Sequence, residues 1–178
     1  MALSPTIFKF KIDLSNTDRN HYDALNLTVA QHPSETVERM MARVLAFCIH
    51  AEQNPVFTKG LSEVDEPAIW SHTLDGLLSL WIDVGEPASE RIKKATRLAS
   101  KTVIYSFNSK SETWWGQEKN RCSRLKVSVY QFQWAGIQAL AKLVQRTMNL
   151  AVIITDDSAY IANELGECEV AWTTLQES

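Results

Sequence analysis

The sequence has little of what marks disulfide-rich, disordered or membrane-spanning proteins. Its three cysteines, among 178 residues, stand far apart without Cys-x-x-Cys spacing, which is typical of reduced thiols rather than of a disulfide framework or a zinc site. Six glycines and five prolines are too few for a low-complexity chain, and an aromatic content of 9% is too high for a disordered one. No stretch approaches the roughly 18 apolar residues of a membrane-spanning helix. The first residues also lack the apolar segment of a signal peptide, so we expect a cytoplasmic protein without a membrane partner.

The chain also lacks an excess of charge of either sign. It has 18 basic and 21 acidic residues, a formal net charge of −3. This balance argues against a protein that coats itself on nucleic acid or anionic lipid, although local basic patches are compatible with it. The length predicts a single domain over residues 1–178, large enough to bury a core without disulfides or a structural metal.

The patterning of apolar residues predicts an α/β fold. Residues 7–14 and 24–29 alternate apolar and polar side chains, which predicts an opening β-hairpin. Residues 33–53 repeat apolar side chains at spacings of three and four, which predicts an amphipathic helix. The nearly all-apolar run 77–84 indicates a strand covered on both faces, and the next strand is expected at 102–107. About 17 residues separate these two strands, so we expect them to be parallel and connected by a helix.

The rest of the chain continues the alternation of strands and helices and then ends in short strands. The further expected elements are a strand at 68–71, a helix that begins at Pro87, a helix near 112–120, a strand at 126–132, a helix around Ile137 to Val144, and short strands at 151–155, 159–162 and 169–173. The last three are separated by turn residues and predict a terminal antiparallel meander. The predicted fold is therefore α/β with a mixed sheet and flanking helices.

Four carboxylates are candidates for a metal site. Asp83 ends the apolar strand, where open α/β sheets place ligands, and its charge is costly to bury unless it is paired or binds a cation. Glu38 lies at the border of the apolar stripe of its helix, whereas Glu35 is expected to point further toward solvent. Asp65 and Glu66 stand at the start of the strand at 68–71. If they converge, such oxygens would suit Mg²⁺ or Mn²⁺; the alternatives are solvated acids and ion pairs with neighbouring arginines.

A basic run follows an acidic one. Residues 63–90 contain seven acids and no base, and residues 91–101 contain five bases and no acid. Four of the bases are candidates for contacts to the phosphates of nucleic acid: Lys93, Lys94, Arg97 and Lys101. Helical spacing places the last three within about 60° of one another, with Lys93 on the flank. The alternative interpretation is a solvated helix face.

Several strings of residues carry a resemblance to a known family. They are Thr6–Lys9, Ala30–Met40, Asp65–Trp70, Leu80–Gly85 and Arg91–Ala95. In this order they resemble the bacterial YaeQ family of small cytoplasmic proteins, which is similar in fold to the PD-(D/E)XK nuclease superfamily. The resemblance implies a restriction-endonuclease-like core between the opening hairpin and the terminal meander.

The resemblance also implies roles for individual carboxylates. In PD-(D/E)XK nucleases, carboxylates hold metal ions that activate water and stabilise the leaving oxygen. Glu38 would be the carboxylate on the helix, and Asp83 the acid of the strand motif. An aspartate is expected after Pro67 but alanine stands there, so Asp65 or Glu66 would have to replace it.

The lysine of the strand motif is missing as well, because the motif reads Asp83-Val84-Gly85. Lys93 or Lys94 on the following helix would have to replace it, and we expect Lys93, whose stem could reach back toward Asp83. Two functions follow from the sequence. One is a divalent-metal-dependent nuclease or phosphodiesterase with Glu38, Asp83 and Lys93 as catalytic residues. The other is a catalytically inactive nuclease-fold module that binds protein or nucleic acid.

Overall fold

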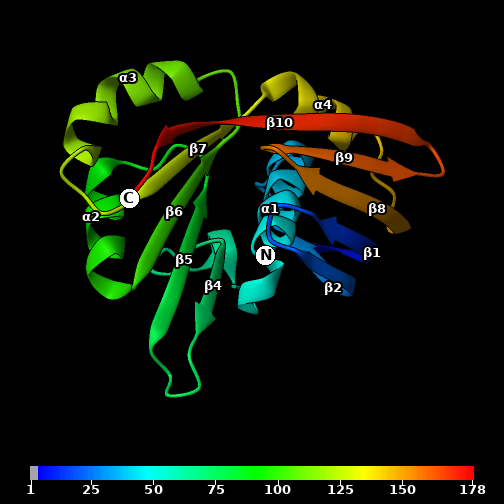
Figure 1. Ribbon diagram of the computed structural model, residues 1–178, viewed down its shortest axis with the longest axis horizontal. Helices are drawn as coiled ribbons and strands as arrows, with labels where there is room; N and C mark the ends of the chain where they lie inside the picture. Colours follow the sequence, from blue (N-terminus) through cyan, green and yellow to red (C-terminus); the bar gives the residue numbers. More distant parts are fainter. Residues whose placement is uncertain (1–3) are drawn as a thin grey trace.

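One mixed sheet of ten strands curves around a central helix in the computed structural model, which describes residues 4–178 (Figure 1). The strands are β1 (Thr6–Asn16), β2 (His21–Gln31), β3 (Val56–Phe57), β4 (Ile69–His72), β5 (Leu78–Val84), β6 (Lys101–Ser106), β7 (Ser128–Phe132), β8 (Thr147–Thr155), β9 (Ser158–Asn163) and β10 (Gly166–Gln176). Their order across the sheet is β2-β1-β8-β9-β10-β7-β6-β5-β4-β3. The α-helices of the described residues are α1 (Val37–Ile49), α2 (Ser89–Leu98), α3 (Ser111–Cys122) and α4 (Trp134–Ala141).

Helix α1 is the centre of the fold. Thr36 caps it, because its Oγ1 accepts a hydrogen bond from the backbone N–H of Arg39 at 3.1 Å. Every residue from Met40 to Ile49 is buried, including Arg43. The prediction of an amphipathic helix over 33–53 was correct in type but too long, because α1 spans only Val37–Ile49. From Met40 onward the helix has no exposed face, since the curved sheet covers it on several sides (Figure 1).

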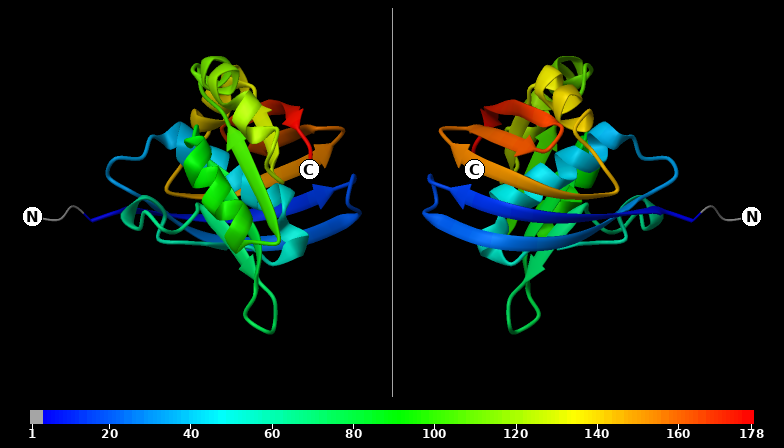
Figure 2. Two further views of the ribbon diagram at one scale, coloured as in Figure 1. Left: turned by 90° about the vertical axis from the view of Figure 1, so that its left-hand side faces the viewer. Right: turned by 90° about the vertical axis from the view of Figure 1, so that its right-hand side faces the viewer.

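The predicted opening hairpin is confirmed. β1 and β2 pair antiparallel, and β1 alternates strictly between buried and exposed residues from Lys9 to Leu14. The views in Figure 2 show this hairpin crossing the molecule beside β8. β1 pairs parallel with β8, so the first and last thirds of the chain form one half of the sheet.

The predicted parallel unit and the terminal meander are also confirmed. β5 and β6 run parallel and are joined through α2, and β6 and β7 are parallel in turn. β8, β9 and β10 pair antiparallel. β10 is longer than predicted and continues from β9 onto β7, which joins the two halves of the sheet. The α/β class with a mixed sheet is thus established.

A chain of buried polar groups crosses the core beside α1. The ring of His50 lies 2.6 Å from the Tyr105 hydroxyl through Nε2 and 2.7 Å from Gln53 Oε1 through Nδ1. Because an amide oxygen can only accept, Nδ1 carries the proton and Nε2 accepts from Tyr105. Burial lowers the pKa of His50 to about 3 and raises the pKa of Tyr105. Both side chains are therefore neutral at pH 7.

The cysteines and the helices were also compared with the predictions from the sequence. Cys48, Cys122 and Cys168 are all free thiols, as their spacing predicted. Among residues 4–178, no helix combines the length and the apolar character that crossing a bilayer requires.

Candidate functional site

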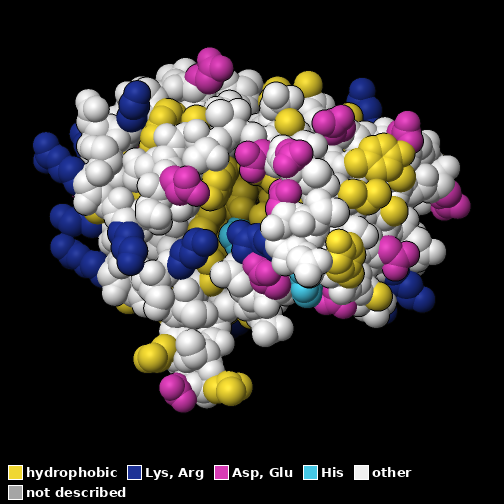
Figure 3. All heavy atoms as spheres, viewed as in Figure 1, with side chains coloured by type: hydrophobic (Ala, Val, Ile, Leu, Met, Phe, Trp, Pro, Cys, Tyr) yellow, Lys and Arg dark blue, Asp and Glu magenta, His cyan; other side chains and the backbone are white. Residues whose placement is uncertain are grey.

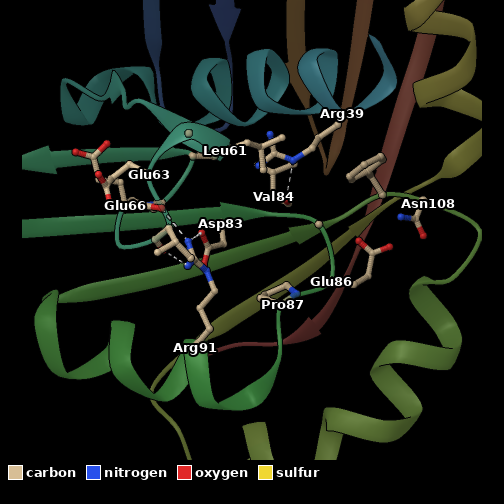
Figure 4. A pocket seen from close by; sticks show the side chains of 16 residues that line it. Arg39, Leu61, Glu63, Glu66, Asp83, Val84, Glu86, Pro87, Arg91 and Asn108 are labelled. Carbon is tan, nitrogen blue, oxygen red and sulfur yellow. Dashed lines mark hydrogen bonds and ion pairs between the residues drawn. The ribbon is translucent and has the colours of Figure 1, made fainter. Parts of the chain in front are cut away.

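A cavity of about 430 Å³ opens where β5 and β6 end (Figure 4). Its floor is formed by Asp83 and the residues after it, and Arg39 of α1 lies on one side. The segment 60–68, which precedes β4, closes another side, and Phe107 and Asn108 follow β6. The carboxyl ends of parallel strands place this cavity where α/β sheets commonly bind ligands.

Asp83 is buried at the end of β5, and both of its oxygens are occupied. Arg91 of α2 donates from Nε to Oδ2 at 3.0 Å and from Nη2 to Oδ1 at 3.1 Å. Trp81 donates from its indole Nε1 to Oδ2 at 3.1 Å. The charge of the carboxylate is thus compensated by a two-pronged ion pair, which is the arrangement that guanidinium and carboxylate groups favour.

Arg91 also connects two parts of the cavity wall. Its Nη1 donates to the backbone oxygen of Val64 at 2.6 Å, and its Nη2 donates to that of Glu66 at 2.8 Å. The guanidinium lies 5.8 Å from the ring centre of Trp81. Four of its five N–H groups therefore have acceptors, and the segment before β4 is held to β5 and α2 through this one side chain.

The structure does not gather the four predicted carboxylates around one point. Asp83 and Glu66 line the cavity, but Glu66 Oε2 accepts the backbone N–H of Lys59 at 3.0 Å. Asp65 is exposed and pairs with Lys94 at 3.1 Å, and Glu38 of α1 does not line the cavity. Within the described part of the chain, no three His, Cys, Asp or Glu side chains are grouped closely enough to hold a metal ion.

Arg91, rather than Lys93, lies against Asp83. Lys93 is exposed and lines a different depression, between α2 and the residues around Arg121 and Arg124. The helix explains the difference, since Arg91 is only about 40° around α2 from the buried Ala95, four residues away. That phase was readable in the sequence and indicates an inward arginine. Lys101, expected on the helix face, instead begins β6 beyond the end of α2.

A second buried ion cluster adjoins the cavity, and the sequence analysis misplaced it. Glu35, expected toward solvent, is 6% exposed. Its carboxylate accepts from Arg43 Nη2 at 2.7 Å and Nε at 2.8 Å and also pairs with Arg39. Because α1 begins only at Val37, Glu35 does not follow the helical periodicity used to place it. Arg39 connects this cluster to the cavity, because it pairs with Glu35, lines the cavity and donates from Nε to Val84 O at 3.3 Å.

Glu86 is a further polar group of the cavity that the sequence did not single out. It is half-buried, and its Oε1 is shielded from solvent without a hydrogen-bond partner. Burial raises the pKa of this carboxyl, while Asn108 and the positive charges of Lys110 and Arg39 oppose the shift. Glu86 therefore gives the cavity a carboxyl that is in no ion pair within residues 4–178 and has one oxygen without a hydrogen-bond partner.

A basic surface lies outside the cavity, over α2 and α3. Figure 3 shows Lys and Arg side chains gathered along the side of the molecule that these helices form. The exposed bases are Lys93, Lys94 and Arg97 on α2, and Lys119, Arg121 and Arg124 on α3 and the turn after it. The two helices share a small core, and Trp114 Nε1 of α3 donates to Pro87 O before α2 at 2.8 Å.

The protein is thus of the α/β class, with a curved sheet around a buried helix and a pocket beside the Asp83–Arg91 ion pair at the ends of its parallel strands. The family model described as "YaeQ: YaeQ protein" matches residues 1–172, and the chain belongs to the YaeQ family. The resemblance found in the sequence strings is thus confirmed.

Known relatives cover nearly the whole chain. The chain is 36% identical over 179 aligned residues to a protein of Salmonella typhi and 35% identical to one of Escherichia coli K12, both named "Uncharacterized protein YaeQ", with 99% of each chain covered. Among solved structures, it is similar to the YaeQ protein from Xanthomonas axonopodis pv. citri, with a TM-score of 0.94, 34% identity and coverage of 98% of this chain and 100% of that one. The YaeQ protein from Pseudomonas syringae gives a TM-score of 0.92, 32% identity and coverage of 98% and 97%.

Proposed function

We propose that the protein is a non-catalytic binding module that holds the phosphate backbone of nucleic acid against α2 and α3. The observation that carries the proposal is the gathering of six exposed bases on these two adjacent helices and the turn after α3, in a chain whose net charge is −3. Four acids adjoin these bases: Glu90, Glu112 and Glu118 on the same helices, and Asp65, which pairs with Lys94. Arg121 pairs with Glu118 at 3.7 Å, and the six bases outnumber the four acids. Phosphate contacts of this kind supply most sequence-independent affinity for nucleic acid.

The order of elements supports a nuclease-like origin for this module. From α1 to β6 the chain forms a helix, the strands β3, β4 and β5, a helix and a strand. β4 and β5 are antiparallel, and β5 and β6 are parallel. This is the order that the resemblance to the PD-(D/E)XK superfamily implies, and we infer that the core is a variant of it. In this variant the cavity at the end of β5 corresponds to the nuclease site.

The side chains of the cavity do not fit a metal-dependent nuclease. Asp83, the acid of the strand motif, gives both oxygens to Arg91 and Trp81. A guanidinium thus occupies the position where a cation would have to contact Asp83. Lys93 is exposed and lines another depression, and Glu38 lies outside the cavity wall. This arrangement favours the binding module over the nuclease with Mg²⁺ or Mn²⁺, Glu38, Asp83 and Lys93.

The first test is binding. The triple variant Lys93→Glu, Arg97→Glu and Arg124→Glu reverses three charges of the basic surface. We expect it to weaken binding of fluorescein-labelled oligonucleotides about tenfold or more, and to make the slope of log K against log salt shallower by about 2 to 3. Fluorescence anisotropy at several salt concentrations measures both quantities.

The matched control reverses three exposed lysines on other elements: Lys9→Glu, Lys11→Glu and Lys142→Glu. Both variants change the net charge equally, so a general effect of charge would weaken them alike. Equal losses, or no measurable binding by the wild-type protein to single- or double-stranded DNA or RNA, would contradict the proposal.

The second test is cleavage. Incubated with Mg²⁺ or Mn²⁺ and a panel of DNA and RNA substrates, the purified protein is expected to leave every substrate intact, because Asp83 is held by Arg91. A nuclease of known activity serves as the positive control, and gel electrophoresis gives the result. Metal-dependent cleavage that disappears in Asp83→Ala would establish the nuclease instead.

A further inference from the structure

Strand β2 forms one end of the sheet and has a strand neighbour, β1, on one side only (Figure 1). The hydrogen bonds of β1 show which backbone groups of β2 face the free side. The N–H of Lys9 donates to Arg146 O at 2.8 Å, toward β8, so Lys9 and its partner Thr28 do not bond to each other. Because backbone groups alternate along a strand, the N–H and C=O groups of five residues face away from β1: Tyr22, Ala24, Asn26, Thr28 and Ala30.

This edge lacks the protection that exposed strand edges usually have. Proteins protect such edges with very short strands, prolines, lysines or bulges. The opposite end of the sheet follows this rule, since β3 has two residues and Pro55 precedes it. β2 has eleven residues, pairs with β1 without a bulge, and contains no Lys, Arg or Pro. Asp23 is its one formally charged side chain.

We propose that β2 pairs antiparallel with β2 of a second copy of this chain, with Asn26 on the two-fold axis. In this register Ala24 lies opposite Thr28, and Tyr22 opposite Ala30, of the second copy. All five are the residues whose backbone groups face outward. The N–H groups of Asn26, Thr28 and Ala30 would meet the free C=O groups of Asn26, Ala24 and Tyr22 of the second copy. The Ala24 N–H donates to Asp23 Oδ1 at 2.8 Å and would exchange that acceptor for the Thr28 carbonyl of the second copy. The carbonyl of Ala30 already accepts from Arg43 Nη2 at 3.0 Å, which leaves one lone pair for the Tyr22 N–H of the second copy.

The side chains of β2 are complementary to themselves in the same register. Leu25 and Leu27 are half-buried against the core. In the dimer, Leu25 of one copy would lie opposite Leu27 of the second copy, and both side chains would lose their remaining exposure to solvent. Asp23 lies opposite Val29, at the far end of the interface from the other Asp23, so like charges do not meet. The edge thus matches a second copy of itself in hydrogen bonds, apolar contact and charge.

Charge placed on the two-fold axis tests the pairing. Asn26 and Asn149 are both exposed and lie on either side of Lys11, but Asn26 is on the edge strand and Asn149 is inside the sheet on β8. We expect the wild-type protein to move from its monomer mass of 20.1 kDa toward twice that mass in sedimentation velocity as its concentration rises. Asn26→Lys should remain monomeric at the highest concentration, and Asn149→Lys should behave like the wild type.

A cross-link gives a second readout that also detects a weak dimer. Opposed residues in a hydrogen-bonded antiparallel pair have Cα atoms about 5.5 Å apart, within the range of a disulfide. Mild oxidation of Asn26→Cys should therefore give a covalent dimer on a non-reducing gel, while Asn149→Cys and the wild type should not.

The outcomes separate clearly. A monomer in Asn26→Lys together with a dimer in Asn149→Lys, or the selective cross-link alone, supports the pairing. A wild-type protein that stays monomeric and an Asn26→Cys variant that cross-links no better than Asn149→Cys would overturn it. So would an Asn26→Lys variant that dimerises as well as the wild type, because the dimer would then use another surface.

Discussion

Arg91→Ala is expected to lower the free energy of unfolding by about 3 kcal/mol, because it leaves the buried Asp83 carboxylate without its counter-charge. The same change removes the hydrogen bonds to Val64 and Glu66, so the cavity wall before β4 should also become more open to hydrogen exchange. Urea denaturation measures the first effect, and amide exchange of residues 60–68 measures the second.

Arg97→Ala is the matched control, because Arg97 is an exposed arginine on the same helix. It should change stability by less than about 0.5 kcal/mol. The double variant Asp83→Ala and Arg91→Ala should be less destabilised than the sum of the single changes, since it leaves no uncompensated buried charge. If Arg91→Ala is no less stable than Arg97→Ala, the ion pair is not important for the fold.

Acid is expected to destabilise the protein through His50. The pKa of His50 is about 3 in the folded protein and about 6.5 in an unfolded chain. Between these values the unfolded state binds a proton that the folded state does not, so stability decreases as the pH falls. The free energy of unfolding is expected to fall through His50 by about 1.4 kcal/mol per pH unit, or by about 2 to 3 kcal/mol between pH 7 and pH 4.5. Above about pH 7.5 this contribution to the free energy of unfolding vanishes, because His50 is then neutral in both states.

His50→Gln isolates this contribution, because glutamine does not titrate while other groups continue to do so. The difference in unfolding free energy between pH 7 and pH 4.5, measured in urea, should be smaller in His50→Gln than in the wild type by about 2 to 3 kcal/mol. His72→Gln, a change at an exposed histidine, should leave the difference unaltered. An unaltered difference in His50→Gln would show that His50 is protonated in the folded protein as readily as in the unfolded chain.

Local sequence patterns predicted the individual strands and helices, but they did not predict which distant strands pair with each other in the sheet. The opening hairpin, the parallel β5–β6 pair and the final meander each depend on residues close in sequence, and all three were recognised. The pairing of β1 with β8 depends on residues from opposite ends of the chain, and no local pattern encodes it. Without that pairing, the burial of α1 on several sides could not be foreseen.

The candidate site was located by the sequence, but its contacts were not. Asp83 was identified from its place at the end of an apolar strand, and the cavity lies there. Its partner was assigned to Lys93 because the resemblance asks for a lysine, whereas the phase of α2 points Arg91 inward. Glu35 was misplaced because a helical wheel was applied before the helix begins. Glu86 has no distinctive pattern, since its lack of a partner is visible only in three dimensions.

The pairing of β1 with β8 has a consequence for the order in which the protein can fold during synthesis. The β1–β2 hairpin leaves the ribosome first, yet the strand beside which it comes to rest begins at Thr147. Until β8 is made, the β8-facing edge of β1 and the buried face of the hairpin remain uncovered. Pairing between such distant segments makes folding slow and leaves its intermediates prone to aggregation. A ribosome that stalls before β8 therefore holds a nascent chain with an open strand edge, which is the kind of surface that chaperones bind.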